Sequence, residues 1–341
     1  MTVRMTPWER LEAAARREEV DFVPAYVGAP GRTYKEGSGI DTLKRYPEAV
    51  HLISVGRGVD PTIFGSRVDP RSAALDADWW APLLRDVTES DKLSVPSREA
   101  LLPRLLQARD AVLARYPEEA RRRYGGGGWT TAISGPMDLA CRLMGHLGYQ
   151  LILIGFYRHP REVHRLFDVL ARANVEWVKL CLEVLGDVRV LHFADHGLAL
   201  ISPRHFPVFG LPYWRREVEA MPRGSIIWYH NEGDVSHLLD AVPEMGVDVF
   251  EFGWVDIKAA KTRIGDRVCL LGNIDPTTVL LRGSPTDVIR ECRNAISIAA
   301  PGGGYILSSR GGETPRTPIE NIDAMYTASL KYGKYPSLTA D

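Results

Sequence analysis

The stretch "SIIWYHNEGDVSHLLDAVPEMGVDVFEFGW", residues 225–254, contains the repeating unit that decides the fold. Its first run, Ser225–His230, is apolar on both faces and therefore predicts a buried strand of a parallel sheet. Asp234 can cap a helix that ends at Gly246, because aspartate is a favoured first residue and glycine a favoured last one. Asp248–Phe252 is a second apolar run of strand length. Strand, helix and strand in this order indicate a βα unit.

The same alternation recurs along the chain, where short apolar runs are separated by longer segments of helical period. The pattern predicts further strands at Phe22–Val27, Trp129–Ser134, Val188–Ala194, Val268–Asn273 and Gly304–Ser308. We therefore expect an α/β fold, a distorted (β/α)₈ TIM-type barrel, in a single domain over residues 1–341. Residues 1–125 are expected to form an N-terminal helical elaboration with the first strand, and residues 126–337 the main βα repeats.

Prolines and caps mark the expected helix boundaries. Pro160 begins a helix that extends to Gly186, and its apolar residues recur at helical spacing, which predicts a face packed on the core. Ser202-Pro203 opens another helix. A further helix is expected over Ser97–Arg122, within the least regular part of the sequence, Gly28–Arg123.

Composition and charge exclude several classes of protein. With 45% hydrophobic and 25% charged residues, a substantial core can form, and a net charge of −1 gives no reason to expect nucleic acid or an anionic membrane. The longest apolar stretch, Tyr149–Tyr157, is far shorter than the ~20 residues that span a bilayer. The N-terminus lacks the apolar core of a signal peptide, and the four cysteines form no CxxC pair. A reducing cytoplasm is the expected setting.

Barrel enzymes carry their sites at the face of the barrel where the C-terminal ends of the strands lie. Polar residues at the C-terminal ends of the predicted strands are therefore the candidates for a site. This criterion selects, in chain order, His192, Asp195, His196, His230, Glu232, Glu251, Asn273, Asp275, Arg310 and Glu313. The sequence has no GxxxxGK[ST] loop, no HExxH and no GxSxG elbow.

Glu251 is the most informative of these residues, because a carboxylate among Val249, Phe250 and Phe252 is costly to bury unless it is paired or bound to a metal. A structural ion pair and a site role both remain open for it. His230 and Glu232 share one face of an extended segment, with Cβ atoms about 7 Å apart, so that one ion or ligand could contact both. Histidine and carboxylate are acceptable zinc ligands.

Several motifs of the second half resemble the uroporphyrinogen decarboxylase superfamily, which includes corrinoid-linked methyltransferases. The motifs are "GNIDP" at 272–276, "GGGYIL" at 302–307 and "TPIEN" at 317–321, in this order. Weaker similarity is present in "GPMDLACRLMG" at 135–145. The resemblance covers most of the chain, and it implies a distorted (β/α)₈ barrel with its site at the C-terminal mouth.

The resemblance also carries expectations for particular residues. The decarboxylases bind their acidic tetrapyrrole with an arginine-containing element near the N-terminus, and this chain retains only Gly31-Arg32 of it. Gly311 stands at the position where the decarboxylases have a histidine. The methyltransferase branch has His-x-Cys and a later cysteine as zinc ligands. Here the histidine is His230, but Glu232 replaces the first cysteine and Gly311 the second. Harder oxygen ligands would then replace soft thiolates.

We therefore expect a methyltransferase that demethylates a small O-methyl or N-methyl compound and passes the methyl group to cobalamin on a corrinoid partner protein. The expected zinc set is His230, Glu232 and Glu251, and the expected catalytic residues are these three with Asp195 and His196. Substrate-binding residues are expected to be Arg32, Tyr229, Trp254, Asn273 and Arg310. Similarity to the superfamily implies a homodimer.

Two alternatives remain open. The first is a decarboxylase or other lyase in which Arg32 or Arg310 holds the carboxylate of the substrate. The second is a non-catalytic barrel that binds a small molecule at its mouth.

Overall fold

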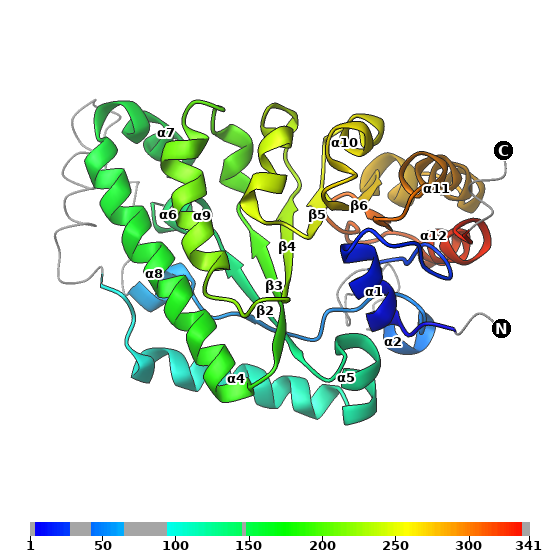
Figure 1. Ribbon diagram of the computed structural model, residues 1–341, viewed down its shortest axis with the longest axis horizontal. Coiled ribbons are helices and arrows are strands. Elements are labelled where there is room, and N and C mark those ends of the chain that lie inside the picture. Colours follow the sequence, from blue (N-terminus) through cyan, green and yellow to red (C-terminus); the bar gives the residue numbers. More distant parts are fainter. Residues whose placement is uncertain (1–3, 28–41, 65–93, 145–147, 336–341) are drawn as a thin grey trace. The chain divides into compact units, whose positions relative to one another are not determined.

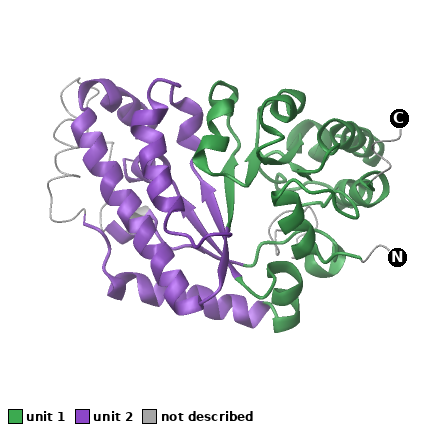
Figure 2. Cartoon of the chain, in the orientation of Figure 1, with its two compact units in different colours: residues 1–53, 116–128, 226–341 green, residues 54–115, 129–225 purple. Residues whose placement is uncertain are grey.

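Parallel strands that pair in the order of the sequence form the framework, as the alternating pattern predicts (Figure 1). The computed structural model describes residues 4–27, 42–64, 94–144 and 148–335. Two compact units are distinguished within the chain (Figure 2). Unit 1 comprises Met1–Ile53, Tyr116–Gly128 and Ile226–Asp341, and unit 2 comprises Ser54–Arg115 and Trp129–Ser225.

Unit 2 contains the strands β1 (Ser54–Arg57), β2 (Trp129–Ser134) and β3 (Val188–Ala194), paired in parallel. Strands β2 and β3 have the bounds expected from the sequence. Strand β1 was not predicted, because "SVGR" is short, contains Gly56 at a positive φ of 73°, and has little apolar character. Its pairing with β2 identifies it as a strand.

The long helix α8 (Pro160–Leu185) confirms the helix expected from Pro160 onward, and its apolar residues Val163, Leu166 and Leu170 are buried. The helix expected from Ser202-Pro203 differs: a π-helical turn precedes α9, which begins only at Leu211. The other helical elements of unit 2 are η1 (Pro61–Phe64), α4 (Arg98–Arg115), α6 (Pro136–Leu143), α7 (Gly148–Arg158), η4 (His196–Leu200), η5 (Phe206–Gly210) and α9 (Leu211–Val218).

A buried polar pair joins α8 to α9 inside unit 2. The amide of Asn174 donates to Oε1 of Glu217 at 2.6 Å and to the carbonyl oxygen of Ser134 at 2.8 Å. Glu217 is completely buried. Burial raises the pKa of its carboxyl well above the usual range, so the protonated form is favoured in the folded protein.

Unit 1 contains the strands β4 (Ile226–Asn231), β5 (Val249–Phe252), β6 (Cys269–Ile274) and β7 (Tyr305–Ser309), again paired in parallel. The expected strand Phe22–Val27 forms only isolated bridges among the described residues. Ala25 pairs with Leu307 of β7, and the carbonyl oxygen of Pro24 accepts the Leu307 N–H at 2.9 Å. Since proline has no N–H to donate, the ladder at this position is short.

The helices of unit 1 differ from expectation in two places, the second of them where the chain passes from unit 2 into unit 1. The segment between β4 and β5 consists of two 3₁₀ turns, with Pro243 starting the second, and Asp234 accepts the Ser236 N–H at 2.9 Å before the first. The helix expected over Ser97–Arg122 is interrupted at Pro117, because proline disfavours helical backbone in the residue before it. The helical elements are α1 (Pro7–Ala15), α2 (Thr42–Arg45), α5 (Glu118–Gly125), η6 (Ser236–Ala241), η7 (Pro243–Met245), α10 (Ile257–Ile264), η8 (Pro276–Leu281), α11 (Pro285–Ala299) and α12 (Ile319–Tyr332).

Helices α11 and α12 lie side by side in unit 1 (Figure 1). Ser284 and Asp287 form a capping box at the start of α11, which satisfies backbone N–H groups that have no partner inside the helix. None of the described helices is by itself long and apolar enough to cross a membrane.

Candidate functional site

A buried carboxylate orients His230 at the C-terminal end of β4 and β5 in unit 1. The parallel register places His230 directly beside Glu251, with Nδ1 of the histidine 3.0 Å from Oε1 of the glutamate. The indole Nε1 of Trp228 donates to the other carboxylate oxygen at 2.8 Å. Glu251 is only 5% exposed, so this pairing offsets the cost of burying its charge. A proton on Nδ1 would face this carboxylate and would leave Nε2 as the nitrogen able to bind an ion.

The exposed residue Glu232 contacts two glycines, Gly253 directly after β5 and Gly311 in the loop after β7. A Cβ at Gly253 would lie 2.0 Å from the carbonyl oxygen of Glu232, and a Cβ at Gly311 would lie 2.5 Å from its Oε2. Gly311 also has a positive φ of 67°, which glycine adopts without strain. Donor atoms of His230 and Glu232 lie within 4.8 Å of each other. One nitrogen and one oxygen donor are therefore close enough for a single cation to contact both.

Three of the expected substrate-binding residues, Trp254, Asn273 and Arg310, line one cavity of about 350 Å³ in unit 1. The guanidinium of Arg310 lies over the Trp254 ring, 4.2 Å from its centroid, and its Nη1 is 3.4 Å from Oδ2 of Asp275. Asn273 is held by donation to the carbonyl oxygen of Val255 at 2.8 Å. The cavity thus combines an aromatic surface, a cation and an amide.

Unit 2 contains a second histidine held by a buried carboxylate. Oδ2 of Asp138 lies 2.7 Å from Nδ1 of His196, while its Oδ1 accepts the Gly197 N–H and the Tyr149 hydroxyl, each at 3.0 Å. Burial by itself would raise the pKa of Asp138. The hydrogen bond and charge of His196 and the backbone donors outweigh burial and lower this pKa below its usual value. Asp138 is therefore ionised and fixes the orientation of the His196 ring.

Asp195 lies against Asp138 but has the opposite protonation preference. Its Oδ1 accepts the Asp138 N–H at 3.1 Å, and a Cβ at Gly135 would lie 2.1 Å from its Oδ2. Burial and the charges of Asp138 and Glu217 raise the pKa of Asp195 well above its usual value. The pKa values of these two neighbouring carboxyl groups are thus shifted in opposite directions, which favours an ionised Asp138 and a protonated Asp195. Opposite shifts of this kind are typical of acid and base pairs.

Of the expected substrate-binding residues, Tyr229 does not line the cavity with Trp254, Asn273 and Arg310. Tyr229 is 1% exposed and stacks on Phe250 with ring centroids 5.3 Å apart. Because side chains alternate along a strand, it points to the opposite face of β4 from His230. Its hydroxyl accepts a hydrogen bond from Asn231 at 2.8 Å. Arg32 lies outside the described residues.

Sequence reasoning missed Asp138 and Trp228. Asp138 follows β2 closely, so the search for polar residues after predicted strands could have found it. Trp228 lies inside an apolar run, where a tryptophan is most simply explained by packing. Its hydrogen bond to Glu251 depends on the register of β4 and β5, which the sequence does not reveal.

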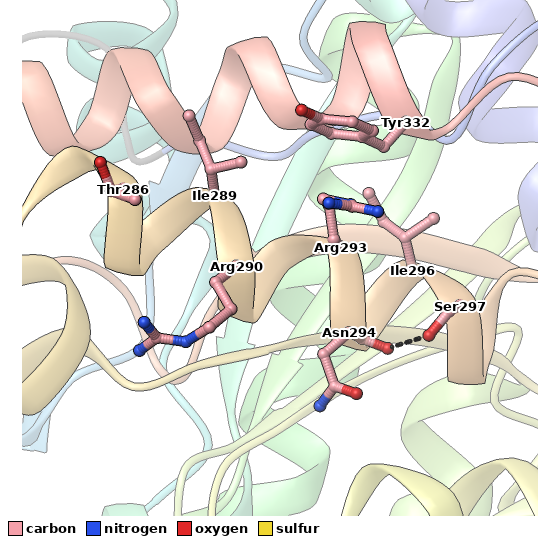
Figure 3. A pocket seen from close by; sticks show the side chains of 8 residues that line it. All are labelled: Thr286, Ile289, Arg290, Arg293, Asn294, Ile296, Ser297 and Tyr332. Carbon is pink, nitrogen blue, oxygen red and sulfur yellow. Dashed lines mark hydrogen bonds between the residues drawn. The ribbon is translucent and has the colours of Figure 1, made fainter.

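A second cavity, of about 500 Å³, lies between α11 and α12 and is the one drawn in Figure 3. There the Arg293 guanidinium lies 4.8 Å from the centroid of the Tyr332 ring. Arg290 is paired with Asp287 and Glu291 on its own helix. None of the expected site residues lines this cavity.

Comparison with known proteins relates the chain to one family. The uroporphyrinogen decarboxylase (URO-D) family model matches residues 75–332. The uroporphyrinogen decarboxylase of Trichodesmium erythraeum is 25% identical over 270 residues, which is 76% of this chain and 72% of that one. That of Chlorobium luteolum is 25% identical over 316 residues, with 86% and 85% covered, and that of Methylibium petroleiphilum is 29% identical over 265 residues, with 74% and 68% covered.

Among solved structures, a methyltransferase from Methanosarcina mazei superposes with a TM-score of 0.67. The superposition covers 96% of this chain and 99% of that chain, at 18% sequence identity. At this identity the likeness shows the fold alone. It confirms the predicted α/β class with a TIM-barrel-like fold.

Proposed function

This chain belongs to the uroporphyrinogen decarboxylase family, and on that basis we propose that it is a methyltransferase of the corrinoid-linked kind. It would remove the methyl group of a small O-methyl or N-methyl compound and pass it to a corrinoid partner protein. The observation that carries the proposal is the donor pair His230 and Glu232, with Glu251 orienting the histidine. Decarboxylation of a tetrapyrrole gives no reason for such a pair.

The donor set fits a zinc ion. Imidazole nitrogen and carboxylate oxygen are both zinc ligands, and a carboxylate on the second ring nitrogen is the usual support of a zinc-bound histidine. His230 and Glu232 would hold the ion, and Glu251 would complete the set as ligand or as the group that orients His230. A bound zinc would supply Lewis acidity, greater with these ligands than with two thiolates because less charge is donated to it.

The chain's own residues have separate roles in this proposal. Trp254, Asn273 and Arg310 bind and orient the substrate in their shared cavity. In unit 2, the carboxylate of Asp138 orients the ring of His196, and Asp195 is buried beside Asp138. These roles follow from the side chains that each group contacts within its own unit.

A decarboxylase or lyase is the second candidate, supported by the names of the relatives at 25–29% identity. Arg310 would then hold the carboxylate that is lost. Release of carbon dioxide from a carboxylated substrate, without methyl transfer, would favour it. Tight binding with no turnover of any substrate would favour a non-catalytic barrel instead.

The deciding experiment combines metal content with methyl transfer to reduced cobalamin. Protein purified without added zinc should contain close to one equivalent, and less than about a tenth of an equivalent would contradict the proposal. Glu232→Ala should lose both the metal and the methyl transfer. Asp234→Ala is the matched control, because Asp234 is an exposed carboxylate two residues away that accepts hydrogen bonds from the backbone and side chain of Ser236 and is not one of the donor pair. Equal metal content in both variants would remove Glu232 from the ligand set.

A further inference from the structure

We propose that unit 2 binds an anionic lipid surface through the outward side of α7 and the turns beside it. Helix α7 contains the longest apolar stretch of the sequence, Tyr149–Tyr157, to which the proposed function assigns no role. An apolar stretch too short to span a bilayer belongs to a buried core helix or to a helix that lies in the membrane interface. The exposure of α7 therefore decides which of the two it is.

Helix α7 is buried on one side only. It packs on α6 and α8 (Figure 1), and its Ile152 and Phe156 side chains are buried. On its outward side, Ile154 is 41% exposed, and Tyr157, three residues later on the same face, is 73% exposed. A helix at a protein surface normally carries polar side chains on its outward side. The core of unit 2 therefore accounts for only one of the two apolar sides of α7.

The π-helical turn η5 extends this exposed apolar surface. Its Phe209 ring stacks on the Phe156 ring of α7, with centroids 4.4 Å apart. The His205 ring, directly before η5, lies 4.7 Å from the Tyr157 ring. Val208 of this turn is 46% exposed. The apolar surface of α7 thus continues onto η5.

The 3₁₀ turn η4 lies next to the start of α7. Its first residue, His196, and Tyr149 of α7 contact the same carboxylate, that of Asp138. Its last residue, Leu200, is 51% exposed. Seven large apolar side chains are exposed among the described residues, and five of them form this surface, here called the apolar face: Tyr149, Ile154, Tyr157, Leu200 and Val208. Single exposed apolar residues are normal, but a cluster of them marks an interaction site.

Arginines border the apolar face. Arg158 directly follows Tyr157 in α7, and Arg204 directly precedes His205, on which the Tyr157 ring packs. Both arginines are exposed, and neither forms an ion pair with a described residue. Two positive charges beside the apolar face are thus available to an anionic partner.

The excess of positive charge extends over the segments that carry the apolar face. Among the exposed arginines of these segments, Arg216 is paired with Asp168. The net charge of −1 for the whole chain conceals this local excess. Residues 142–165 and 196–216 contain no lysine, one acidic residue, Glu162, and seven exposed arginines: Arg142, Arg158, Arg161, Arg165, Arg204, Arg215 and Arg216.

A lipid surface fits these side chains better than a folded partner does. Apolar side chains from one helix and two turns can enter the interface of a bilayer without a matching shape, whereas a folded partner needs a complementary surface. Tyrosine favours the level of the lipid headgroups, and arginine binds phosphate through paired N–H groups. Anionic lipids offer their phosphates at any spacing. With 11 residues, α7 can lie on such a surface but cannot cross it.

Sedimentation of the full chain with lipid vesicles tests the inference. The vesicles consist of phosphatidylcholine alone or of equal parts of phosphatidylcholine and phosphatidylglycerol. We expect binding to the mixed vesicles to be about tenfold tighter or more, and to weaken as the salt concentration rises, because mobile ions screen the arginines. No binding to the mixed vesicles, or equal binding to both kinds, would overturn the inference. The assay needs neither metal nor methyl acceptor, so its outcome is independent of the proposed function.

Two matched pairs of variants locate the contact. Ile154→Gln should weaken binding to the mixed vesicles about tenfold. Leu113→Gln should not, although Leu113 of α4 is exposed to a similar extent, 42% against 41%.

The second pair concerns charge. Arg158→Gln should weaken binding to the mixed vesicles about fivefold, whereas Arg223→Gln, which changes an exposed arginine outside the two basic segments, should not. All four side chains are exposed, so the variants should keep the fold, which circular dichroism checks. Equal effects within either pair would contradict the assignment of the apolar face.

A second copy of the chain is the other occupant that the experiment distinguishes. Sedimentation velocity without vesicles gives the oligomeric state of the wild type and of Ile154→Gln. The same state in both proteins is the result we expect. A dimer that Ile154→Gln converts to a monomer, together with no binding to the mixed vesicles, would assign the apolar face to self-association and overturn the inference.

Discussion

Gly311 and Glu232 form a matched pair whose energetic coupling can be measured. Replacing Gly311 by alanine puts a Cβ 2.5 Å from Oε2 and 2.9 Å from Cβ of Glu232. It also forces a side chain onto a positive φ of 67°, at a cost of about 1–2 kcal/mol. Overpacking adds only about 1 kcal/mol, because Oε2 is the end of an exposed, flexible side chain that can rotate away, and the Cβ contact needs a shift of a few tenths of an ångström. We therefore expect Gly311→Ala to lower the free energy of unfolding by about 2–3 kcal/mol.

The coupling is measured in a double-mutant cycle with Glu232→Ala. In that background the contact with Oε2 is gone, although the contact with Cβ remains, so Gly311→Ala should cost about 0.5–1 kcal/mol less than in the wild type. Urea unfolding, followed by tryptophan fluorescence, gives the four free energies. Asp234→Ala replaces Glu232→Ala in the control cycle, which should be additive. Additivity within about 0.5 kcal/mol in the Glu232 cycle would refute the steric reasoning.

Two further predictions concern buried carboxylates in the two units. Glu217 has a raised pKa, so between its usual value and the raised one the folded state binds more protons than the unfolded state. Stability should therefore fall as pH rises across that interval, and Glu217→Gln, which keeps the acceptor for Asn174, should lack this fall and be more stable than the wild type at pH values above the usual carboxyl pKa. Thermal unfolding at several pH values checks this, and a variant with the wild-type pH dependence would show that another group titrates. Glu251→Gln should weaken zinc binding about 10–100-fold by loosening His230, as measured by competition with a chelator, and unchanged zinc affinity would remove the orienting role.

Local patterns in the sequence predicted many of the strands and helices. The strands at Trp129–Ser134 and Val188–Ala194 and the start of the helix at Pro160 were predictable because burial periodicity and caps act within a few residues of each other. The short strand Ser54–Arg57 was not predictable, since its backbone depends on a partner strand far along the chain. The 3₁₀ turns after β4 were missed for a different, local reason: Pro243 lies inside the segment that was expected to be one helix, and it starts a second turn there.

The positions of His230, Glu232 and Arg310 at the ends of strands could be predicted from the sequence, because they follow from the alternation of strands and loops. The pairing of these residues depends on the folded chain. Glu251 faces His230 because of the register of two strands, and Glu232 fits against Gly311 because distant loops meet at one edge of the sheet in unit 1. Such contacts join residues far apart in the chain, so their geometry is set by packing and register rather than by local sequence.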